Sequence, residues 1–80
     1  MDTTQQADLV LDCRGVSCPM PVIQTADAIQ QVLPGQTLLL LSTDPGVEPD
    51  MRAWTRRTGH GFLDVSHDGE AYRVLLRRAG

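Results

Sequence analysis

The chain has 80 residues, 41% of them hydrophobic and 21% charged, which allows one small domain with one core and excludes two domains around a deep cleft. Ten acidic residues outnumber seven basic ones, and the net charge of -3 argues against direct nucleic-acid binding through general attraction to phosphates. Every basic residue is an arginine, which excludes chemistry that needs a lysine amine.

Residues 1–7 are polar and aperiodic, and we expect them to form a flexible N-terminal tail before a single domain that spans residues 8–78. The start lacks the basic end and apolar run of a secretory signal. Two cysteines are too few for the disulfide framework of a secreted domain. We therefore expect a cytoplasmic protein with free thiols and no membrane association.

The first strand is expected over residues 8–13, where one alternate set consists of Leu9, Leu11 and Cys13. A short turn over residues 14–17 follows. The period of two predicts that this set faces a core while the intervening residues face the other side.

The first helix is expected to begin at Pro19 and Pro21, because proline is tolerated in the first turn of a helix. It should end at Pro34-Gly35, since proline disfavours helix in the residue before it. The predicted buried face recurs at spacings of four, three and four: Val22, Ala26, Ile29 and Leu33. The predicted solvent face consists of Gln24, Asp27, Gln30 and Gln31.

Residues 36–43 contain four successive leucines and predict a central strand that is too short to cross a membrane. A second helix is expected from Asp44, which would cap it, to Gly59. Its predicted buried face consists of Val47, Met51, Trp54 and Thr58, so Met51 and Trp54 are expected in the core. Glu48 stands four residues before Arg52, in the favourable order for an ion pair.

Two last strands are expected over residues 62–66 and 71–78, with a tight hairpin at Asp68-Gly69. The order β-α-β-α-β-β, with right-handed crossovers, predicts an α/β two-layer sandwich in which a four-stranded mixed sheet carries two helices on one face. One alternate set from Leu38 to Leu41 must then point to the uncovered face. We predict a hydrophobic patch there for a partner or a second copy.

The segment with the most distinctive chemistry is Cys18-Pro19-Met20-Pro21, which lies between the first strand and the first helix. Each proline biases the preceding residue toward extended backbone, so Cys18 is expected to be presented at the helix start rather than packed in the core. The field of the helix N-terminus, with Arg14 nearby, is expected to lower the pKa of the Cys18 thiol moderately. A thiolate so placed suits attack on a sulfur atom carried by another protein, followed by transfer of that sulfur.

Hydrolytic and metal-dependent alternatives find little support. The two histidines, His60 and His67, are far along the chain and cannot be placed beside Cys18 as a general base. The spacing of Cys13, Cys18 and the histidines fits a structural zinc site poorly. We expect no metal and no cofactor.

The stretch from Leu11 to Val22 (LDCRGVSCPMPV), the Pro34-Gly35 turn and Asp44-Pro45 with its following helix resemble the TusA (SirA-like) family of sulfur-carrier proteins. The resemblance covers about residues 8–78 and includes the Cys-Pro-x-Pro motif near the start of the first helix. It implies that Cys18 accepts sulfane sulfur as a persulfide from a cysteine desulfurase or rhodanese-like donor. It further implies relay to a downstream acceptor protein, in tRNA thiolation, molybdenum-cofactor maturation or sulfur oxidation.

Such a domain is a sulfurtransferase-like carrier that acts with partner enzymes. The residues expected to position Cys18 are Arg14, Gly15, Pro19, Met20 and Pro21. Two other classes stay open: a non-catalytic protein-binding or regulatory module, and a thiol-redox sensor that uses Cys13 and Cys18. The parity of Cys13 with Leu9 and Leu11 favours a small core residue over a resolving thiol. Arginines at positions 52, 56, 57, 73, 77 and 78 could form docking surfaces, but solvated faces explain them more simply.

Overall fold

The computed structural model describes residues 7–17 and 20–79. The strands are β1 (Leu9–Cys13), β2 (Thr37–Ser42), β3 (Gly61–Asp68) and β4 (Ala71–Arg77), and the helices are α1 (Met20–Ala28) and α2 (Val47–Thr58), with a short 3-10 helix η2 (Ile29–Gln31) after α1. Residues 1–6 of the predicted tail, and both Cys18 and Pro19, lie outside the described residues. Neither described helix has the length and apolarity needed to cross a membrane.

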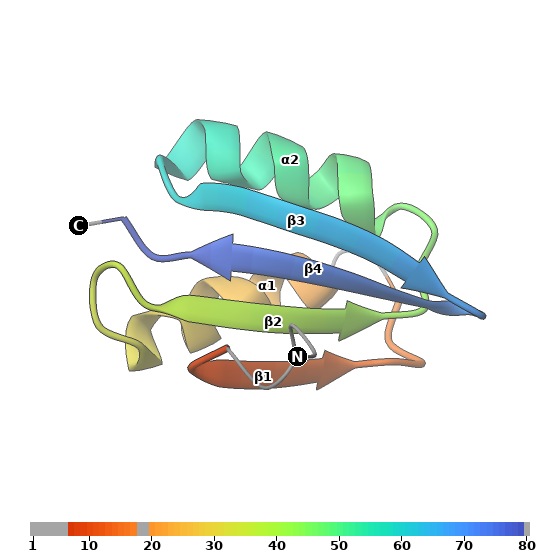
Figure 1. The fold of residues 1–80 in the computed structure, drawn as a ribbon. Helices are drawn as coiled ribbons and strands as arrows, with labels where there is room; N and C mark the ends of the chain where they lie inside the picture. Colours follow the sequence, from red (N-terminus) through yellow and green to blue (C-terminus); the bar gives the residue numbers. More distant parts are fainter. Residues whose placement is uncertain (1–6, 18–19, 80) are drawn as a thin grey trace.

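The sheet has the strand order β1-β2-β4-β3, with β1 and β2 parallel and the other neighbours antiparallel. The parallel pair requires a crossover, which α1 provides, whereas β3 and β4 follow each other in a hairpin (Figure 1). Both helices pack on the same face of the sheet, because one alternate set of β2 and β4 shares the core with them. The predicted two-layer α/β fold is thereby confirmed.

The core lies between this sheet face and the two helices. Leu38 and Leu40 of β2 are fully buried, and Met51 and Trp54 of α2 pack in the same cluster, as predicted. Full burial of a leucine or methionine side chain contributes about 1.5–3 kcal/mol. The central strand and α2 therefore contribute much of the stability of this small domain.

The buried face of α1 lies one residue earlier than predicted. Pro21, Thr25, Ala28 and Val32 are buried at spacings of four, three and four, and Ile29 is buried beside them. Of the other predicted residues, Val22 and Ala26 are half-buried and Leu33 is 67% exposed. The prediction for Leu33 was wrong because it followed the apolar residues alone, whereas the buried face includes the polar Thr25.

The second helix begins later than predicted. Gly46, not Asp44, is the N-cap, and the Oδ1 atom of Asp44 accepts a hydrogen bond from the Gly46 amide at 2.9 Å. Asp44 thus stabilises a turn that precedes the helix. Thr55 is buried, whereas Thr58, the last helical residue, is exposed. The ion pair of Glu48 with Arg52 is confirmed at 3.1 Å, and so is the end of the helix at Gly59, which has a φ of 88°.

Two residues, Gly69 and Glu70, connect β3 to β4 in a tight hairpin. Asp68 pairs with Ala71, and Gly69 has a φ of 62° at the first central position, where a type II′ turn favours glycine. Strand β3 is longer than predicted at both ends because its pairing with β4 runs from Gly61 to Asp68. The ladder is regular from Asp64 to the tip of the hairpin, and a register shift between Phe62 and Asp64 interrupts it near the start of β3.

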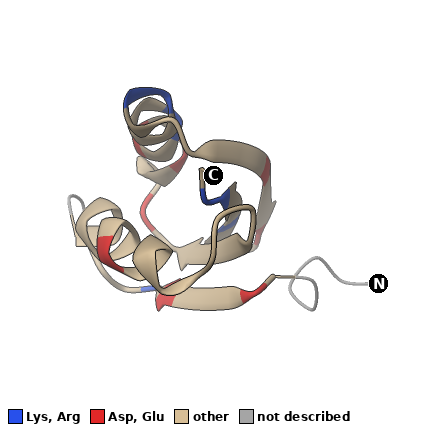
Figure 2. Ribbon diagram, turned by 90° about the vertical axis from the view of Figure 1, so that its left-hand side faces the viewer, with Lys and Arg blue, Asp and Glu red and all other residues tan. Residues whose placement is uncertain are grey.

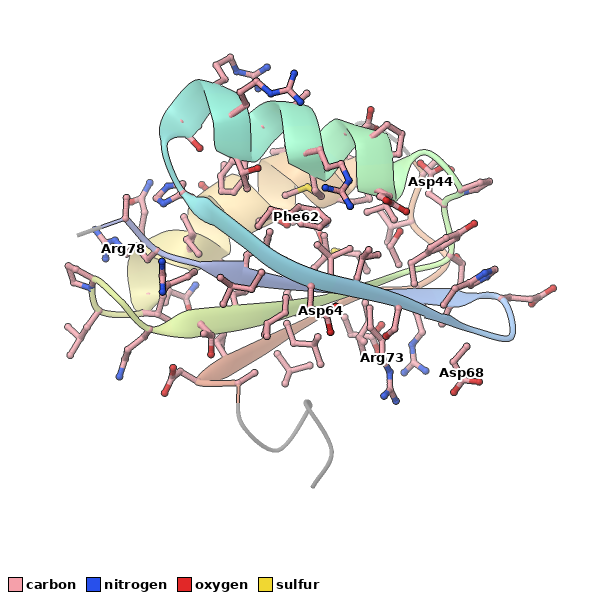
Figure 3. All side chains as sticks on the ribbon, turned by 45° about the horizontal axis from the view of Figure 1, so that its top comes forward. Asp44, Phe62, Asp64, Asp68, Arg73 and Arg78 are labelled. Atoms are coloured by element: carbon pink, nitrogen blue, oxygen red, sulfur yellow. The ribbon has the colours of Figure 1, made fainter. Side chains whose placement is uncertain are left out.

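The sheet face away from the helices is apolar in its middle but is not one continuous patch. Val10 and Leu63 are exposed, whereas Leu39 is only 1% exposed although it lies outside the core cluster. Figure 3 shows the side chains of Asp64 and Arg73 on this side of the sheet, away from α2. The predicted set of leucines does face this way, but charged neighbours interrupt it.

Candidate functional site

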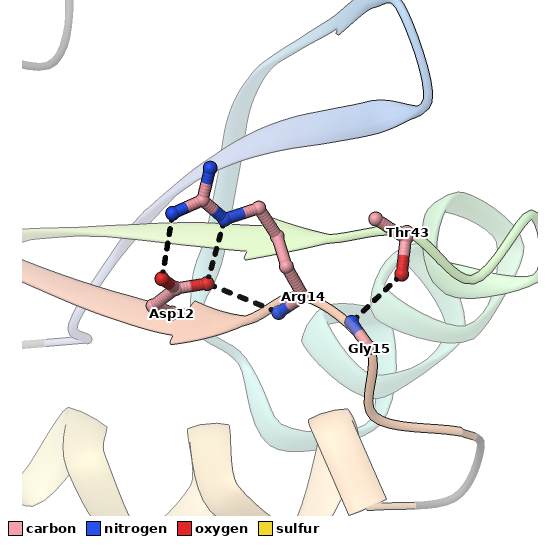
Figure 4. Close-up of polar contacts among 4 residues, drawn as sticks. All are labelled: Asp12, Arg14, Gly15 and Thr43. Carbon is pink, nitrogen blue, oxygen red and sulfur yellow. Dashed lines mark hydrogen bonds and ion pairs between the residues drawn. The ribbon is translucent and has the colours of Figure 1, made fainter.

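The turn after β1 brings the chain to the Cys-Pro-x-Pro motif. The Val16 amide donates to the Cys13 carbonyl at 3.1 Å, and Gly15 has a φ of 81° at the third position of this turn. A type II turn requires a positive φ there, which explains a glycine. The Gly15 amide also donates to Oγ1 of Thr43 at 2.9 Å, which ties the turn to the end of β2 (Figure 4).

The guanidinium group of Arg14 is paired with Asp12. Its Nε and Nη2 atoms donate to the two carboxylate oxygens at 2.9 and 2.8 Å, and the Arg14 amide donates to Oδ1 at 3.0 Å (Figure 4). The hydrogen bonds from the Arg14 side chain and backbone lower the pKa of Asp12 from 3.8 to about 2. The positive charge that Arg14 offers to the neighbouring motif is therefore largely balanced by Asp12.

The described chain resumes at Met20, whose amide donates to the Ser17 carbonyl at 3.0 Å. Pro21 is fully buried in the first turn of α1 and holds that turn against the core. Met20 and Ile23, which are three positions apart on α1, are 41% and 50% exposed. An apolar surface therefore lies directly after the motif.

The candidate nucleophile Cys18 and its neighbour Pro19 lie outside the described residues. Of the predicted positioning residues, the structure describes Arg14 and Gly15 in the turn before them and Met20 and Pro21 at the start of α1. Both described segments lie at the same end of the molecule, where β1 ends and α1 begins (Figure 1).

The other thiol, Cys13, belongs to the core. It is fully buried, and its Sγ atom donates to Oε1 of Gln24 at 3.0 Å. Burial raises the pKa of the Cys13 thiol, and the negative charge of Asp12 raises it further. The predicted core position of Cys13 is confirmed, whereas the prediction that Gln24 faces only solvent was wrong because its amide reaches back to the end of β1.

We predict that Cys13 is protected from thiol reagents in the folded protein. In a Cys18→Ser variant, labelling of Cys13 should be at least about tenfold slower under native conditions than in denaturant, because it requires opening of the core. Because the pKa of the Cys13 thiol is raised in the folded protein, the thiol ionises at lower pH in the unfolded chain. The free energy of unfolding should therefore fall as pH rises above the ordinary thiol value of 9.0. Stopped-flow labelling and urea unfolding at several pH values measure both effects. Equal labelling rates in the two states would contradict the buried position.

Both histidines stack on aromatic side chains. His60 stacks on Trp54 and its Nδ1 atom accepts a hydrogen bond from the Ala79 amide at 2.9 Å. His67 stacks on Tyr72 with ring centroids 4.1 Å apart. Within residues 7–17 and 20–79, no three His, Cys, Asp or Glu side chains are grouped so that they could hold a metal ion.

Two adjoining hollows lie beside the turn that precedes Cys18. One, of about 470 Å³, is lined by residues 15–17 and 43–45, and the other, of about 400 Å³, lies between Thr43, Pro45 and the β3–β4 hairpin. Residues 43–45 are not among the site residues predicted from the sequence. One signal was present: they follow the carboxyl end of a strand parallel to the one that leads to Cys18.

The sequence matches a known protein family over most of its length. A family model described as "Sulfurtransferase TusA" matches residues 9–78. The chain belongs to the TusA family. The predicted family resemblance is therefore confirmed, and membership supports a sulfur-carrier role.

Relatives of known name agree with this membership. The chain is 37% identical over 75 residues to a Bacillus subtilis protein named "Putative sulfur carrier protein YrkF", covering 94% of this chain and 40% of that protein. It is 33% identical over 73 residues to "Putative sulfur carrier protein YrkI" of the same organism, covering 91% of this chain and 97% of that protein. This TusA-family chain thus spans less than half of the first relative and nearly all of the second.

A solved structure shows the same TusA-family fold. The crystal structure of a SirA-like protein from Desulfitobacterium hafniense superposes with a TM-score of 0.77 and covers 90% of this chain and 99% of that one. The two sequences are 18% identical. The four-stranded mixed sheet with two helices is therefore shared with that protein.

Proposed function

We propose that this TusA-family domain carries sulfur as a persulfide on Cys18 and passes it to an acceptor protein. The observation that carries the proposal is that Ser17 and Met20, on either side of the Cys18-Pro19 pair, are both exposed. The other thiol of the chain, on Cys13, is buried and has a raised pKa. Cys18 is thus the thiol whose described neighbours in the sequence are exposed.

The transfer needs no change in net oxidation state. The Cys18 thiolate attacks the terminal sulfur of a donor persulfide, a new S–S bond forms at Cys18, and the donor's own S–S bond breaks to release a thiolate. In the second step an acceptor nucleophile attacks the terminal sulfur on Cys18, and the Cys18 thiolate leaves. The proposed donor is a cysteine desulfurase or a rhodanese-like protein, and a pathway of tRNA thiolation, molybdenum-cofactor maturation or sulfur oxidation would supply the acceptor.

The residues beside Cys18 have proposed positioning roles that follow from their contacts. Gly15 gives the turn its positive φ and binds Thr43, and Arg14 closes onto Asp12 in the same turn. Pro21 anchors the start of α1 in the core, while the exposed Met20 offers a surface for partners. Pro19 is proposed to restrict the backbone of Cys18.

A redox sensor that pairs Cys13 with Cys18 has less support, because the Cys13 thiol is buried and hydrogen bonded to Gln24. A regulatory module that only binds partners differs from a carrier in not needing the Cys18 thiol. We also propose a cytoplasmic location, where thiols stay reduced.

The proposed function is tested by intact-mass spectrometry after incubation with a cysteine desulfurase and cysteine. We expect the full chain to gain the mass of one sulfur atom, which a reductant removes, and peptide mapping should locate it on Cys18. A control incubation without cysteine should give no gain. Sulfur mapped to Cys13, or an unmodified chain beside a desulfurase that turns over, would refute the carrier proposal.

A further inference from the structure

The two hollows beside the turn join into one groove, which we call the edge groove. They share Thr43 and Pro45 as lining residues. Ser17 lines one end, and His67, Glu70 and Tyr72 line the other. An elongated depression assembled from two such hollows fits an extended polypeptide segment better than a compact small molecule.

The edge groove lies at the acidic end of the molecule. Asp44 and Glu70 line it, and none of the described residues that line it is an arginine or a lysine. Glu48 in the first turn of α2 is paired with Arg52, so it adds little charge at this end. Of the two arginines that neighbour lining residues in the sequence, Arg14 is paired with Asp12 and Arg73 lies on the sheet face away from α2. The charge complement of this end is therefore a cation.

The pictures show how the charges are separated along the molecule. Asp44 and Asp68 lie at one end of the domain and Arg78 lies at the opposite end, while Arg73 lies between Asp64 and Asp68 on the open side of the sheet (Figure 3). Figure 2, a view onto that opposite end, shows the last turn of α2 and the end of the chain in blue. These segments contain Arg56 and Arg57 in α2 and Arg77 in β4. A positively charged partner segment is thus directed to the groove and away from the far end.

The far wall of the groove is a pair of stacked rings. His67 and Tyr72 are cross-strand partners in the hairpin, with centroids 4.1 Å apart and planes inclined by only 1°. Aromatic rings beside carboxylates suit a guanidinium group, which stacks on ring faces and forms hydrogen bonds with carboxylate oxygens. The lining therefore favours arginine over other side chains.

We propose that the edge groove binds an extended, arginine-bearing segment of the protein that exchanges sulfur with Cys18. This inference rests on the proposed function. Ser17 and Cys18 are covalent neighbours with Cα atoms about 3.8 Å apart, so a segment that lies along the groove reaches the residue that would carry the sulfur. The partner's arginine would lie between Glu70 and the stacked rings, and its backbone would pass Thr43.

The test is a titration followed by amide NMR of the 15N-labelled full chain. The probe is the peptide acetyl-Gly-Arg-Gly-Arg-Gly-amide, and its counterpart with glutamate in place of arginine is the control. We expect the arginine peptide to shift the amide signals of Thr43, His67 and Glu70, with weaker binding at higher salt. The glutamate peptide should leave them unchanged.

Matched variants distinguish binding in the edge groove from a general effect of the net charge of the protein. Glu70→Lys and Asp64→Lys change the net charge equally, and both residues are exposed on the β3–β4 hairpin. Glu70→Lys should weaken peptide binding by about two- to fivefold, the loss expected for removing an exposed ion pair. Asp64→Lys should change it less than twofold. Glu70→Gln, which removes the charge without adding another, should weaken binding in the same direction.

Four results would overturn the inference. They are the absence of shifts at millimolar peptide, shifts confined to the open face of the sheet, equal effects of the two lysine variants, and stronger shifts in the groove by a single-stranded oligonucleotide than by the peptide. Because the titration uses the unloaded chain, its failure is distinct from failure of sulfur loading, which mass spectrometry measures separately.

Discussion

Replacing Cys18 by serine should abolish sulfur loading altogether. A serine hydroxyl is not ionised near neutral pH and cannot form the S–S bond that a persulfide requires, so no partial activity is expected. We expect the fold to persist, because serine differs from cysteine by a single side-chain atom. Intact-mass spectrometry after incubation with desulfurase and cysteine measures the loss, and circular dichroism checks the fold.

The matched control is Cys13→Ser, which changes the other thiol in the same way. We expect this variant to retain loading, although a hydroxyl in the core should cost about 1–3 kcal/mol of stability even if it donates to Gln24. Full loading of Cys18→Ser would refute the carrier role. Loss of loading in a folded Cys13→Ser variant would support a two-thiol mechanism instead. A module that only docks would bind its partner and exert its effect without loading in either variant.

The strands of this fold are predictable because one face of the sheet is covered and the other is not. The period of two in residues 9–13 places Cys13 in the core, and the structure confirms it. The buried face of α1 is not predictable in the same way. Pro21, Thr25, Ala28 and Val32 are buried, each one residue before a predicted position, and a pattern of apolar residues does not find a face that includes the polar Thr25.

The candidate site also has parts that can be predicted from the sequence and parts that cannot. The Cys18 motif is local in sequence, so a motif analysis can find it, although its own geometry lies outside the described residues. The pairing of Asp12 with Arg14 could have been foreseen, because residues two apart on an extended chain share a side. The edge groove could not, since it combines segments near residues 16, 44 and 70 that meet only because β4 lies beside β2. Strand order of this kind is a property of the assembled sheet.

Truncation of Leu40 to alanine should be the most damaging single change to the core of the central strand. Leu40 is fully buried and lies in the cluster shared by both helices. Leucine-to-alanine changes at such positions cost about 2–5 kcal/mol, while a domain of this length has about 4–12 kcal/mol in total. The melting temperature should fall by at least about 8 °C, measurable by circular dichroism or calorimetry.

Leu41 provides the control, because it is the next residue on the same strand and points to the opposite face of the sheet. It is half-buried beside Arg73, with no helix above it, so Leu41→Ala should cost about 1 kcal/mol. Both variants remove the same atoms, so the difference between them measures what the helix layer adds on one face. Equal destabilisation would mean that the open face is as tightly packed as the core, which would contradict the two-layer arrangement. A much larger effect at Leu40 would show that β2 gains more stability from the helix layer than from the open face of the sheet.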